Sequence, residues 1–364
     1  MITEADVEKL IRPALHVVQP YEPVDPPSVL SQKIGMAEKD IIKIDANENP
    51  YGPSTRAIKA IADYPYTNLY PDPYQRSLRI ALESYTGFNL QNIIAGSGSD
   101  ELIELILRLF LEPGDRIINC PPTFSMYTFC TQICAGIVVD VPRKDDFSLD
   151  MDSILKAIDG HTKVIFIASP NNPSGNIIPR NEVLRLLNTD IIVVIDEAYF
   201  EFSRFTCADM VGKYPNLLVL RTFSKWAGLA GLRVGYGIFP HNIVNHILKI
   251  KQPYNVNAAG QVAAIESLKD LNFLNESVKK IVHERKRLLE MLKTIKWLDV
   301  FDSKANFILC KVRGKDARKV HADLQLKGVF IRYYSSPLLR NFIRVSVGKP
   351  EHSDRLIAEL REVN

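Results

Sequence analysis

Short apolar runs rich in β-branched residues recur along the middle of the chain. Several are apolar at successive positions, as strands covered on both faces are, and helical patterns such as Leu102–Leu111 lie between some of them. We therefore predict a three-layer αβα domain built on a mostly parallel, seven-stranded sheet. The predicted strands are Asn92–Ala95, Arg116–Asn119, Gly136–Val141, Val164–Ala168, Ile191–Ile195, Leu217–Leu220 and Val234–Ile238.

The pattern changes after about residue 250. Residues 258–295 are rich in Ala, Leu, Lys and Glu and predict one long helix. Short strands and two further helices follow, which is typical of a smaller α+β domain. The predicted elements are strands at Asn306–Val312, Val329–Arg332 and Phe342–Val347 and helices at Ala317–Leu326 and Glu351–Glu362.

The first 42 residues are loosely patterned and rich in proline, with Pro26 and Pro27 adjacent. Consecutive prolines favour an extended chain. We predict that residues 1–42 form an arm that packs on the small domain or on a partner subunit. Residues 43–250 then form the large domain, and residues 251–364 form the small C-terminal domain.

Composition excludes several classes of protein. The chain has 364 residues, with 45 Lys+Arg against 42 Asp+Glu, so its net charge of +3 gives no sign of nucleic-acid or anionic-membrane binding. The acidic first residues do not resemble a secretory signal, and the apolar runs are too short to span a bilayer, so we expect a cytoplasmic protein. Five cysteines without a C-x-x-C pair, and scattered histidines, predict reduced thiols and no metal site.

Candidate chemistry collects directly after the predicted strands. Ligands of open α/β sheets bind beyond the carboxyl ends of the strands. Four such segments occur. Taken alone, each also fits an ordinary feature, which is respectively a βα turn, a loop, a helix cap and a solvated lysine. The four segments are the Gly-rich residues 95–101, the Asn- and Pro-rich residues 169–175, Asp196 to Tyr199, and Arg221 to Lys225 with the following Arg233.

Taken together, these segments match what one cofactor requires. Pyridoxal phosphate needs a lysine for its Schiff base and a carboxylate that keeps its ring nitrogen protonated. It also needs hydrogen-bond donors for its phenolic oxygen and a site for its phosphate. The four segments supply these groups in order along one predicted sheet edge.

The sequence resembles the fold type I pyridoxal-phosphate aminotransferases, and within that superfamily it is most similar to the histidinol-phosphate aminotransferases. The resemblance runs from Tyr21 to the last helix and implies a homodimer with shared active sites. It rests on Asn47-Glu48-Asn49-Pro50, Leu69-Tyr70-Pro71, Gly98-Ser99-Asp100-Glu101, Pro121-Pro122-Thr123-Phe124-Ser125-Met126-Tyr127, Asn171-Asn172-Pro173-Ser174-Gly175, Asp196-Glu197-Ala198-Tyr199, Ser224-Lys225 and Ala230-Gly231-Leu232-Arg233-Val234-Gly235.

The resemblance also implies a role for each matching residue. Lys225 would form the Schiff base, and Asp196 would pair with the pyridinium nitrogen. Asn172 and Tyr199 would bond to the phenolic oxygen. Phe124 stands where the family usually stacks a tyrosine on the ring, and the change removes a phenol. The phosphate would be held by Ser99, Asp100, Thr222, Ser224 and Arg233, and by Tyr70 from the neighbouring subunit.

Two arginines of the C-terminal domain are implied to bind substrate. Arg344 would hold an α-carboxylate through a bidentate fork. Arg332 would bind the substrate phosphate, or the distal carboxylate of glutamate, although the nearby Arg340 competes for this role. Tyr21 and Asn47 would complete the pocket.

The implied reaction transfers an amino group between L-histidinol phosphate and 2-oxoglutarate, giving imidazole acetol phosphate and L-glutamate, in histidine biosynthesis. Two enzymes of the same superfamily remain as alternatives, an aromatic-amino-acid aminotransferase and a threonine-phosphate decarboxylase. A ligand-sensing regulator with an aminotransferase-like domain is a third alternative. It requires an added DNA-binding domain, for which the first 40 or so residues are too few and too rich in proline.

Overall fold

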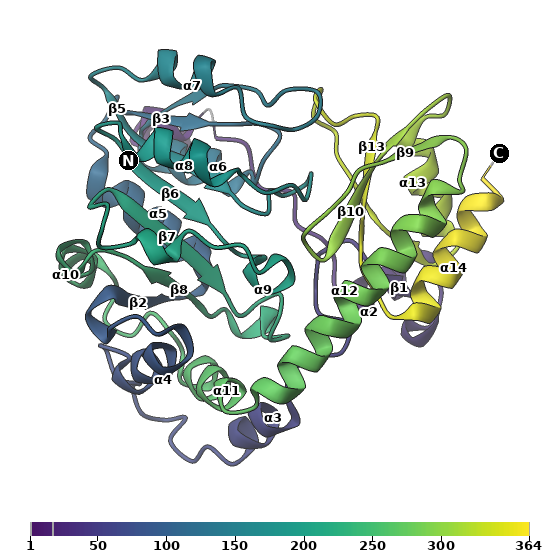
Figure 1. Cartoon of the computed structure of the whole chain (residues 1–364), viewed down its shortest axis with the longest axis horizontal. Helices are drawn as coiled ribbons and strands as arrows, with labels where there is room; N and C mark the ends of the chain where they lie inside the picture. The colour runs from purple at the N-terminus through teal and green to yellow at the C-terminus, as the bar shows by residue number, and fades with distance from the viewer. Residues whose placement is uncertain (1, 17, 364) are drawn as a thin grey trace.

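The computed structural model describes residues 2–16 and 18–363, and its large domain is built on a seven-stranded sheet (Figure 1). The strand order is β2-β8-β7-β6-β5-β3-β4, and β8 is the one strand of this sheet that runs antiparallel to its neighbours. The predicted mostly parallel, seven-stranded sheet is therefore confirmed. The strands are β2 (Ile93–Gly96), β3 (Arg116–Asn119), β4 (Ile137–Asp140), β5 (Thr162–Ala168), β6 (Ile192–Asp196), β7 (Leu217–Thr222) and β8 (Gly235–Ile238).

Helices cover both faces of this sheet, as successive apolar residues require. In β6, Val193 and Ile195 lie in one apolar cluster while Val194 lies in another on the opposite face. Three helices contribute buried residues to the second cluster, namely α5 (Gly98–Phe110), α6 (Met126–Ile133) and α10 (His241–Ile250). The first cluster receives α3 (Thr55–Ala62), α4 (Arg76–Thr86), α7 (Met151–Ala157), α8 (Arg180–Leu187) and the short α9 (Phe200–Ser203).

The C-terminal part forms a smaller α+β domain with its own core, as predicted. Its four-stranded antiparallel sheet has the order β12-β13-β10-β9. The domain contains β9 (Leu298–Val300), β10 (Phe307–Val312), α13 (Ala317–Leu326), β11 (Val329–Phe330), β12 (Arg332–Tyr333), β13 (Phe342–Ser346) and α14 (Pro350–Arg361).

The single long helix predicted over residues 258–295 is wrong. The structure has α11 (Ala258–Leu268) and α12 (Leu271–Lys293), and the chain turns between them at Asp270. The hydroxyl of Ser54 donates a hydrogen bond to the Asp270 carboxylate, which fixes the turn from outside the helix. An aspartate is also a poor residue for a helix interior.

The core of the large domain includes residues of α11 and α12, which lie beyond the predicted domain boundary at residue 250. Ala263 and Leu274 pack in the cluster on the large sheet, whereas Leu288 and Leu292, further along α12, pack in the core of the small domain. Figure 1 shows α12 running from the large domain to the small one. One helix therefore contributes to both cores and links the two domains.

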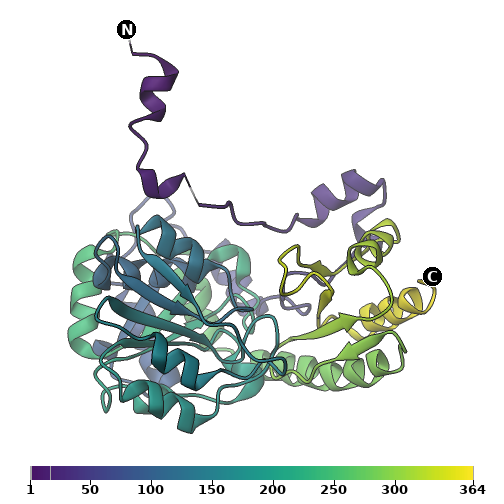
Figure 2. The ribbon, with the colours of Figure 1, turned by 90° about the horizontal axis from the view of Figure 1, so that it is seen from above.

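The N-terminal arm is less extended than predicted. It contains α1 (Glu4–Glu8) and α2 (Pro27–Ile34), and Pro27 occupies the first helical position, where a missing N–H costs nothing. Strand β1 (Ile42–Lys43) then pairs in parallel with β11, so the arm joins the small domain at this point. Figure 2 shows the first part of the arm projecting from the large domain and α2 lying over the small domain.

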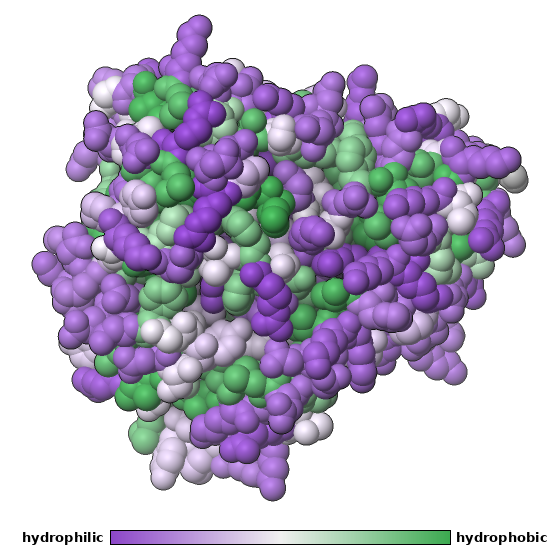
Figure 3. All heavy atoms as spheres, viewed as in Figure 1, coloured by the Kyte–Doolittle hydropathy of each residue, from purple (hydrophilic) through white to green (hydrophobic). Residues whose placement is uncertain are grey.

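The outer surface is mixed in character. The face seen in Figure 3 is mostly hydrophilic, with apolar side chains in scattered patches. Within the described ranges, no helix is both long and apolar enough to cross a membrane.

A matched pair of leucine substitutions tests the packing of α12. Leu292 is fully buried in the small core, whereas Leu326 on α13 is 75% exposed. We expect Leu292→Ala to lower the free energy of unfolding by about 2–5 kcal/mol, because the change removes buried surface and leaves a cavity. Leu326→Ala should change it by less than about 0.5 kcal/mol. Urea unfolding followed by circular dichroism measures both, and equal effects would contradict this packing.

Candidate active site

The strand directions bring the predicted site residues to one edge of the large sheet. Asp196 is the last residue of β6, and Thr222 is the last residue of β7. These neighbouring strands are parallel, so both side chains lie at the same edge. Because β8 is antiparallel, its first residue, Gly235, lies at this edge too and places Arg233 there.

An anion cradle forms where α5 begins. Ser99 and Asp100 lie in the first turn of this helix, whose N–H groups have no helical partners. The guanidinium of Arg233 donates to the Asp100 carboxylate (Nη2 to Oδ2, 2.7 Å) and to the Ser224 hydroxyl (Nη1 to Oγ, 3.3 Å). The Thr222 hydroxyl lies 3.0 Å from the Ser224 hydroxyl.

Two glycines leave the space that this cradle requires. Gly98 has a φ of +76°, and a Cβ there would lie 2.4 Å from Nη2 of Arg233. A Cβ on Gly235 would lie 2.3 Å from the backbone nitrogen of Ser99. Side chains at either position would fill the cradle. Helix N–H groups, hydroxyls and an arginine gathered at one place are a donor set that fits a phosphate.

Asp196 is a buried carboxylate, 4% exposed, with two donors. The Tyr127 hydroxyl donates to Oδ2 (2.7 Å), and the backbone N–H of Ala198 donates to Oδ1 (3.1 Å). Burial raises the pKa of Asp196 to about 6, and these two hydrogen bonds oppose the shift. A buried carboxylate of this kind can hold the proton of a ring nitrogen.

Sequence reasoning assigned no role to Tyr127, although it belongs to one of the quoted motifs. Its ring is fully buried on α6 and stacks on Phe166, with 4.9 Å between ring centroids. The Phe124 and Tyr127 rings form a T-shaped pair, with 5.6 Å between ring centroids. Tyr127 follows Phe124 by three residues within one of the quoted motifs, and this closeness in sequence is the signal that could have identified it.

Lys225 lies in the loop after β7, and its amine donates to the backbone carbonyl of Ala46 (3.1 Å). Burial, and after it the charge of Arg344, lower the pKa of Lys225 to about 8. An amine with this pKa is partly neutral near physiological pH. A neutral lysine amine can act as a nucleophile or as a base.

Asn47 connects the large sheet to the small domain. Its amide nitrogen donates to the Tyr199 hydroxyl (2.9 Å), and its backbone N–H donates to the Ser346 hydroxyl (2.8 Å). The Asn47 side chain is thereby fixed beside Tyr199. Burial raises the pKa of the Tyr199 hydroxyl to about 12. The Tyr199 hydroxyl therefore keeps its proton and can donate a hydrogen bond.

Arg344 is a buried guanidinium at the junction of the two domains, and it is 6% exposed. It donates to the Asn172 side-chain oxygen (Nη1, 2.6 Å) and to the Asp45 carbonyl (Nη2, 2.5 Å). Its Nε is buried and has no hydrogen-bond partner in the part of the chain that the structure describes. A buried donor without a partner is costly, so this geometry suits an incoming anion.

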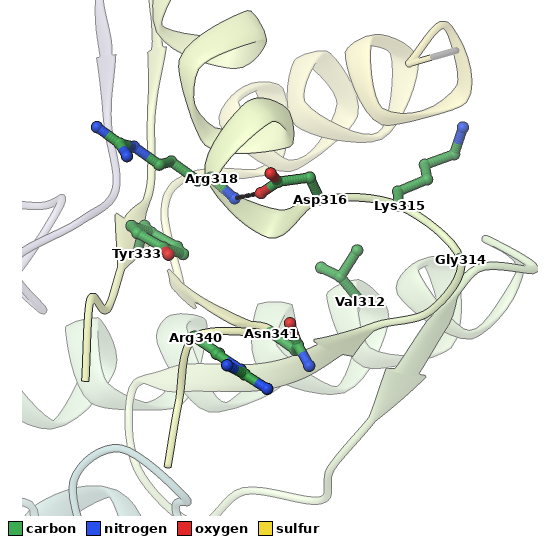
Figure 4. Close-up of a pocket in the computed structure, with 8 residues that line it drawn as sticks. All are labelled: Val312, Gly314, Lys315, Asp316, Arg318, Tyr333, Arg340 and Asn341. Atoms are coloured by element: carbon green, nitrogen blue, oxygen red, sulfur yellow. Dashed lines mark hydrogen bonds between the residues drawn. The ribbon is translucent and has the colours of Figure 1, made fainter. Parts of the chain in front are cut away.

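Arg332 and Arg340 lie at different places, which separates the two candidates for the second anion site. Arg332 donates to the backbone carbonyl of Glu22 (3.0 Å), next to the half-exposed Tyr21 of the arm. Arg340 lines an open cavity of about 550 Å³ together with Tyr333 (Figure 4). Successive strand residues point to opposite faces, so Arg332 and Tyr333 face different ways. The geometry therefore favours Arg332.

Tyr70 lies apart from the rest of the predicted set. Its ring is 81% exposed and stacks on Tyr254, with 4.3 Å between centroids. Across residues 2–16 and 18–363, no hydrogen bond joins Tyr70 to another predicted site residue.

The fold is that of a family of pyridoxal-phosphate-dependent transferases, and comparison with known proteins identifies this family. The model for aminotransferase classes I and II matches residues 39–360. The chain belongs to this family. Within it, the chain belongs with the histidinol-phosphate aminotransferases, to which its nearly full-length relatives at 44–48% identity are assigned by name.

Three similar proteins cover most of the chain. A chloroplastic histidinol-phosphate aminotransferase of Nicotiana tabacum is 48% identical, over 97% of this chain and 86% of its own. A histidinol-phosphate aminotransferase of Roseiflexus castenholzii is 46% identical, over 99% of each chain. A crystal structure of the Sinorhizobium meliloti enzyme in complex with pyridoxal-5'-phosphate is 28% identical, with a TM-score of 0.87 over 97% of this chain and 98% of that one.

The buried position of Asp196 predicts a pH-dependent change in stability of the cofactor-free protein. Its folded-state pKa of about 6 lies above the ordinary value of 3.8, so the native state binds this proton more tightly. The contribution of Asp196 to stability is therefore lost as pH rises through 6, by about 3 kcal/mol in full. We compare the free energy of unfolding of Asp196→Asn with that of the unsubstituted chain at each pH. We expect this difference to shift in favour of the variant by about 2 kcal/mol when the pH is raised from 4.5 to 7.5. Urea unfolding at both pH values measures this gain.

The exposed Asp190 provides the control for this experiment. Asp190→Asn should leave the difference between the two pH values unchanged. A constant difference between Asp196→Asn and the unsubstituted chain would contradict the burial of an ionisable Asp196.

Proposed function

We propose that this chain is a pyridoxal-phosphate-dependent aminotransferase that acts on L-histidinol phosphate and 2-oxoglutarate in histidine biosynthesis. Its products are imidazole acetol phosphate and L-glutamate. The observation that carries the proposal is the proximity of Lys225, Asp196 and the buried Arg344 between the two domains, since the charge of Arg344 acts on Lys225 and the charges of Arg344 and Asp196 both act on Tyr199. The full-length similarity to named histidinol-phosphate aminotransferases supports the choice of substrate.

The residues at the sheet edge fit the cofactor. Bound there, pyridoxal phosphate supplies a carbonyl carbon for the amino group and a ring that withdraws electrons from the substrate Cα. Asp196 would hold the proton on the ring nitrogen, and Phe124 would lie against the ring. Asn172 and Tyr199 donate to the phenolic oxygen. The phosphate is held at Ser99, Asp100, Thr222, Ser224 and Arg233.

Lys225 performs the proton transfer of the reaction. With the cofactor bound, the neutral amine of Lys225 would take the proton from the substrate Cα and would later give a proton back. A pKa of about 8 keeps a useful fraction of this amine neutral. Such acid–base catalysis contributes roughly 10²–10⁴ in rate.

Arg344 and Arg332 hold the anionic groups of the two substrates. Arg344 has an unused N–H and binds the α-carboxylate of glutamate. Arg332 binds the phosphate of histidinol phosphate or the distal carboxylate of glutamate. Tyr21 and Asn47 close the pocket from the arm and from the segment between β1 and α3.

A panel of amino donors tests this assignment. The holoenzyme is mixed with histidinol phosphate, phenylalanine, tyrosine or threonine phosphate, and the absorbance of the cofactor is followed. We expect conversion to be fastest with histidinol phosphate, without release of carbon dioxide. Preference for an aromatic amino acid, or carbon dioxide release from threonine phosphate, would replace this function with one of its alternatives.

The same panel separates the two arginines. Arg332→Gln should lower kcat/KM for histidinol phosphate about tenfold or more relative to phenylalanine, since a charge-assisted bond to phosphate is lost. Arg340→Gln changes the same residue type at the separate cavity of Figure 4 and should leave that ratio unchanged. Equal losses for both donors in Arg332→Gln would count against the phosphate assignment.

We further propose a homodimer in which Tyr70 completes the phosphate site of the neighbouring subunit. The support is an exposed aromatic surface around Tyr70, which is unusual for a face that meets only water. Tyr70 itself is far more exposed than the other cofactor residues. The surface consists of Tyr66, Leu69, Tyr70, Tyr74 and Tyr254, each at least 44% exposed.

Mixing two inactive variants tests the shared site. Lys225→Ala removes the reacting amine, and Tyr70→Ala removes the hydroxyl given to the neighbour. Hybrid dimers then contain one site that carries both substitutions and one that carries neither. Refolding the two variants together should give activity well above the mean of the separate variants. Activity equal to that mean would contradict the shared site.

We also assign the chain to a reducing compartment such as the cytoplasm. All five cysteines are free thiols, and four of them are buried. Burial raises the pKa of Cys120 and of Cys130 to about 12, which keeps these thiols protonated and unreactive.

A further inference from the structure

Tyr334 occupies a position between the two substrate arginines. It directly follows β12 and lies two residues after Arg332. The Cζ atom of Arg332 lies 5.7 Å from the centroid of the Tyr334 ring, and that of Arg344 lies 5.9 Å from it. Both distances are within the range of cation–π contact, so the ring sits against both guanidinium groups.

The hydroxyl of Tyr334 is buried and has no hydrogen-bond partner among the described residues. Most buried hydroxyls in proteins are hydrogen-bonded, so one without a partner requires an explanation. Burial raises the pKa of Tyr334, although the charges of Arg344 and Arg332 oppose the shift, so the hydroxyl keeps its proton. This group is therefore an unused donor between two cations.

The neighbouring Tyr333 shows what a purely structural tyrosine looks like in this strand. Its ring packs against the core of the small domain and lies 5.8 Å from the His321 ring. It also lines the separate cavity that contains Arg340. Tyr334 instead faces Arg332, Arg344 and Tyr21, which all belong to the proposed substrate pocket.

We propose that Tyr334 is a specificity-determining residue whose hydroxyl donates a hydrogen bond to the anionic group of the substrate held by Arg332 and Arg344. The proposal rests on the proposed function and extends the phosphate site by one donor. A phosphate monoester presents three oxygens that accept hydrogen bonds. Histidinol phosphate has no α-carboxylate, so Arg344, which holds that group of glutamate, is free to share the phosphate with Arg332 and the Tyr334 hydroxyl.

Matched tyrosine substitutions in the holoenzyme test this role. Tyr334→Phe keeps the ring and removes only the hydroxyl, and Tyr333→Phe makes the same change on the opposite face. We expect Tyr334→Phe to raise KM for histidinol phosphate roughly tenfold to a hundredfold, the usual effect of losing a hydrogen bond to a charged group. The kcat should change little, because the hydroxyl binds the anion in the ground state as well.

A second measurement does not depend on turnover. Calorimetric titration of each holoenzyme with inorganic phosphate should show weaker binding in Tyr334→Phe and unchanged binding in Tyr333→Phe. Unchanged KM and unchanged phosphate binding in Tyr334→Phe would overturn the proposal, as would equal losses in both variants. If the unsubstituted enzyme does not convert histidinol phosphate, the proposed function fails, and the phosphate titration still decides the role of Tyr334.

Discussion

The arrangement of the site depends on the buried guanidinium of Arg344. This cation is held by an amide oxygen from the large domain and by a backbone carbonyl from the segment that leads into it. No carboxylate forms an ion pair with it within the described part of the chain. A buried charge without a counter-ion is expensive to maintain. The fold therefore stabilises a cation that only a bound anion can neutralise.

The fold makes this arrangement possible through the directions of its strands. Parallel strands bring the carboxyl ends of β6 and β7 to one edge, and antiparallel β8 brings its amino end to the same edge. Arg344 reaches that edge from the small domain because α12 contributes to both cores and Asn47 bonds to both Tyr199 and Ser346. The site is thus built at a domain junction whose two sides are joined by packing and by buried hydrogen bonds.

The sequence predicts features that depend on local pattern. Every predicted strand of the large sheet lies within two residues of an observed one, because apolar periodicity is a property of neighbouring residues. Features that depend on distant contacts were not predictable in this way. The break before α12 is fixed by the hydrogen bond from Ser54, which is 216 residues from Asp270. Asn47 and Ser346 form a hydrogen bond although 299 residues separate them. Tyr334 was missed for the same reason, since its neighbours become visible only when the small domain is folded.

The charges around Lys225 show how the substrate and the reacting amine are coupled. Arg233 also lies near this amine, but its charge is offset by Asp100 at 2.7 Å, whereas Arg344 has no such partner. After burial, the charge of Arg344 is the largest cause of the lowered pKa of Lys225. An anion bound at Arg344 offsets that charge and raises the pKa of the amine. The free amine of Lys225 is therefore partly neutral near physiological pH while Arg344 carries no anion, and it becomes a stronger base once an anion is bound there.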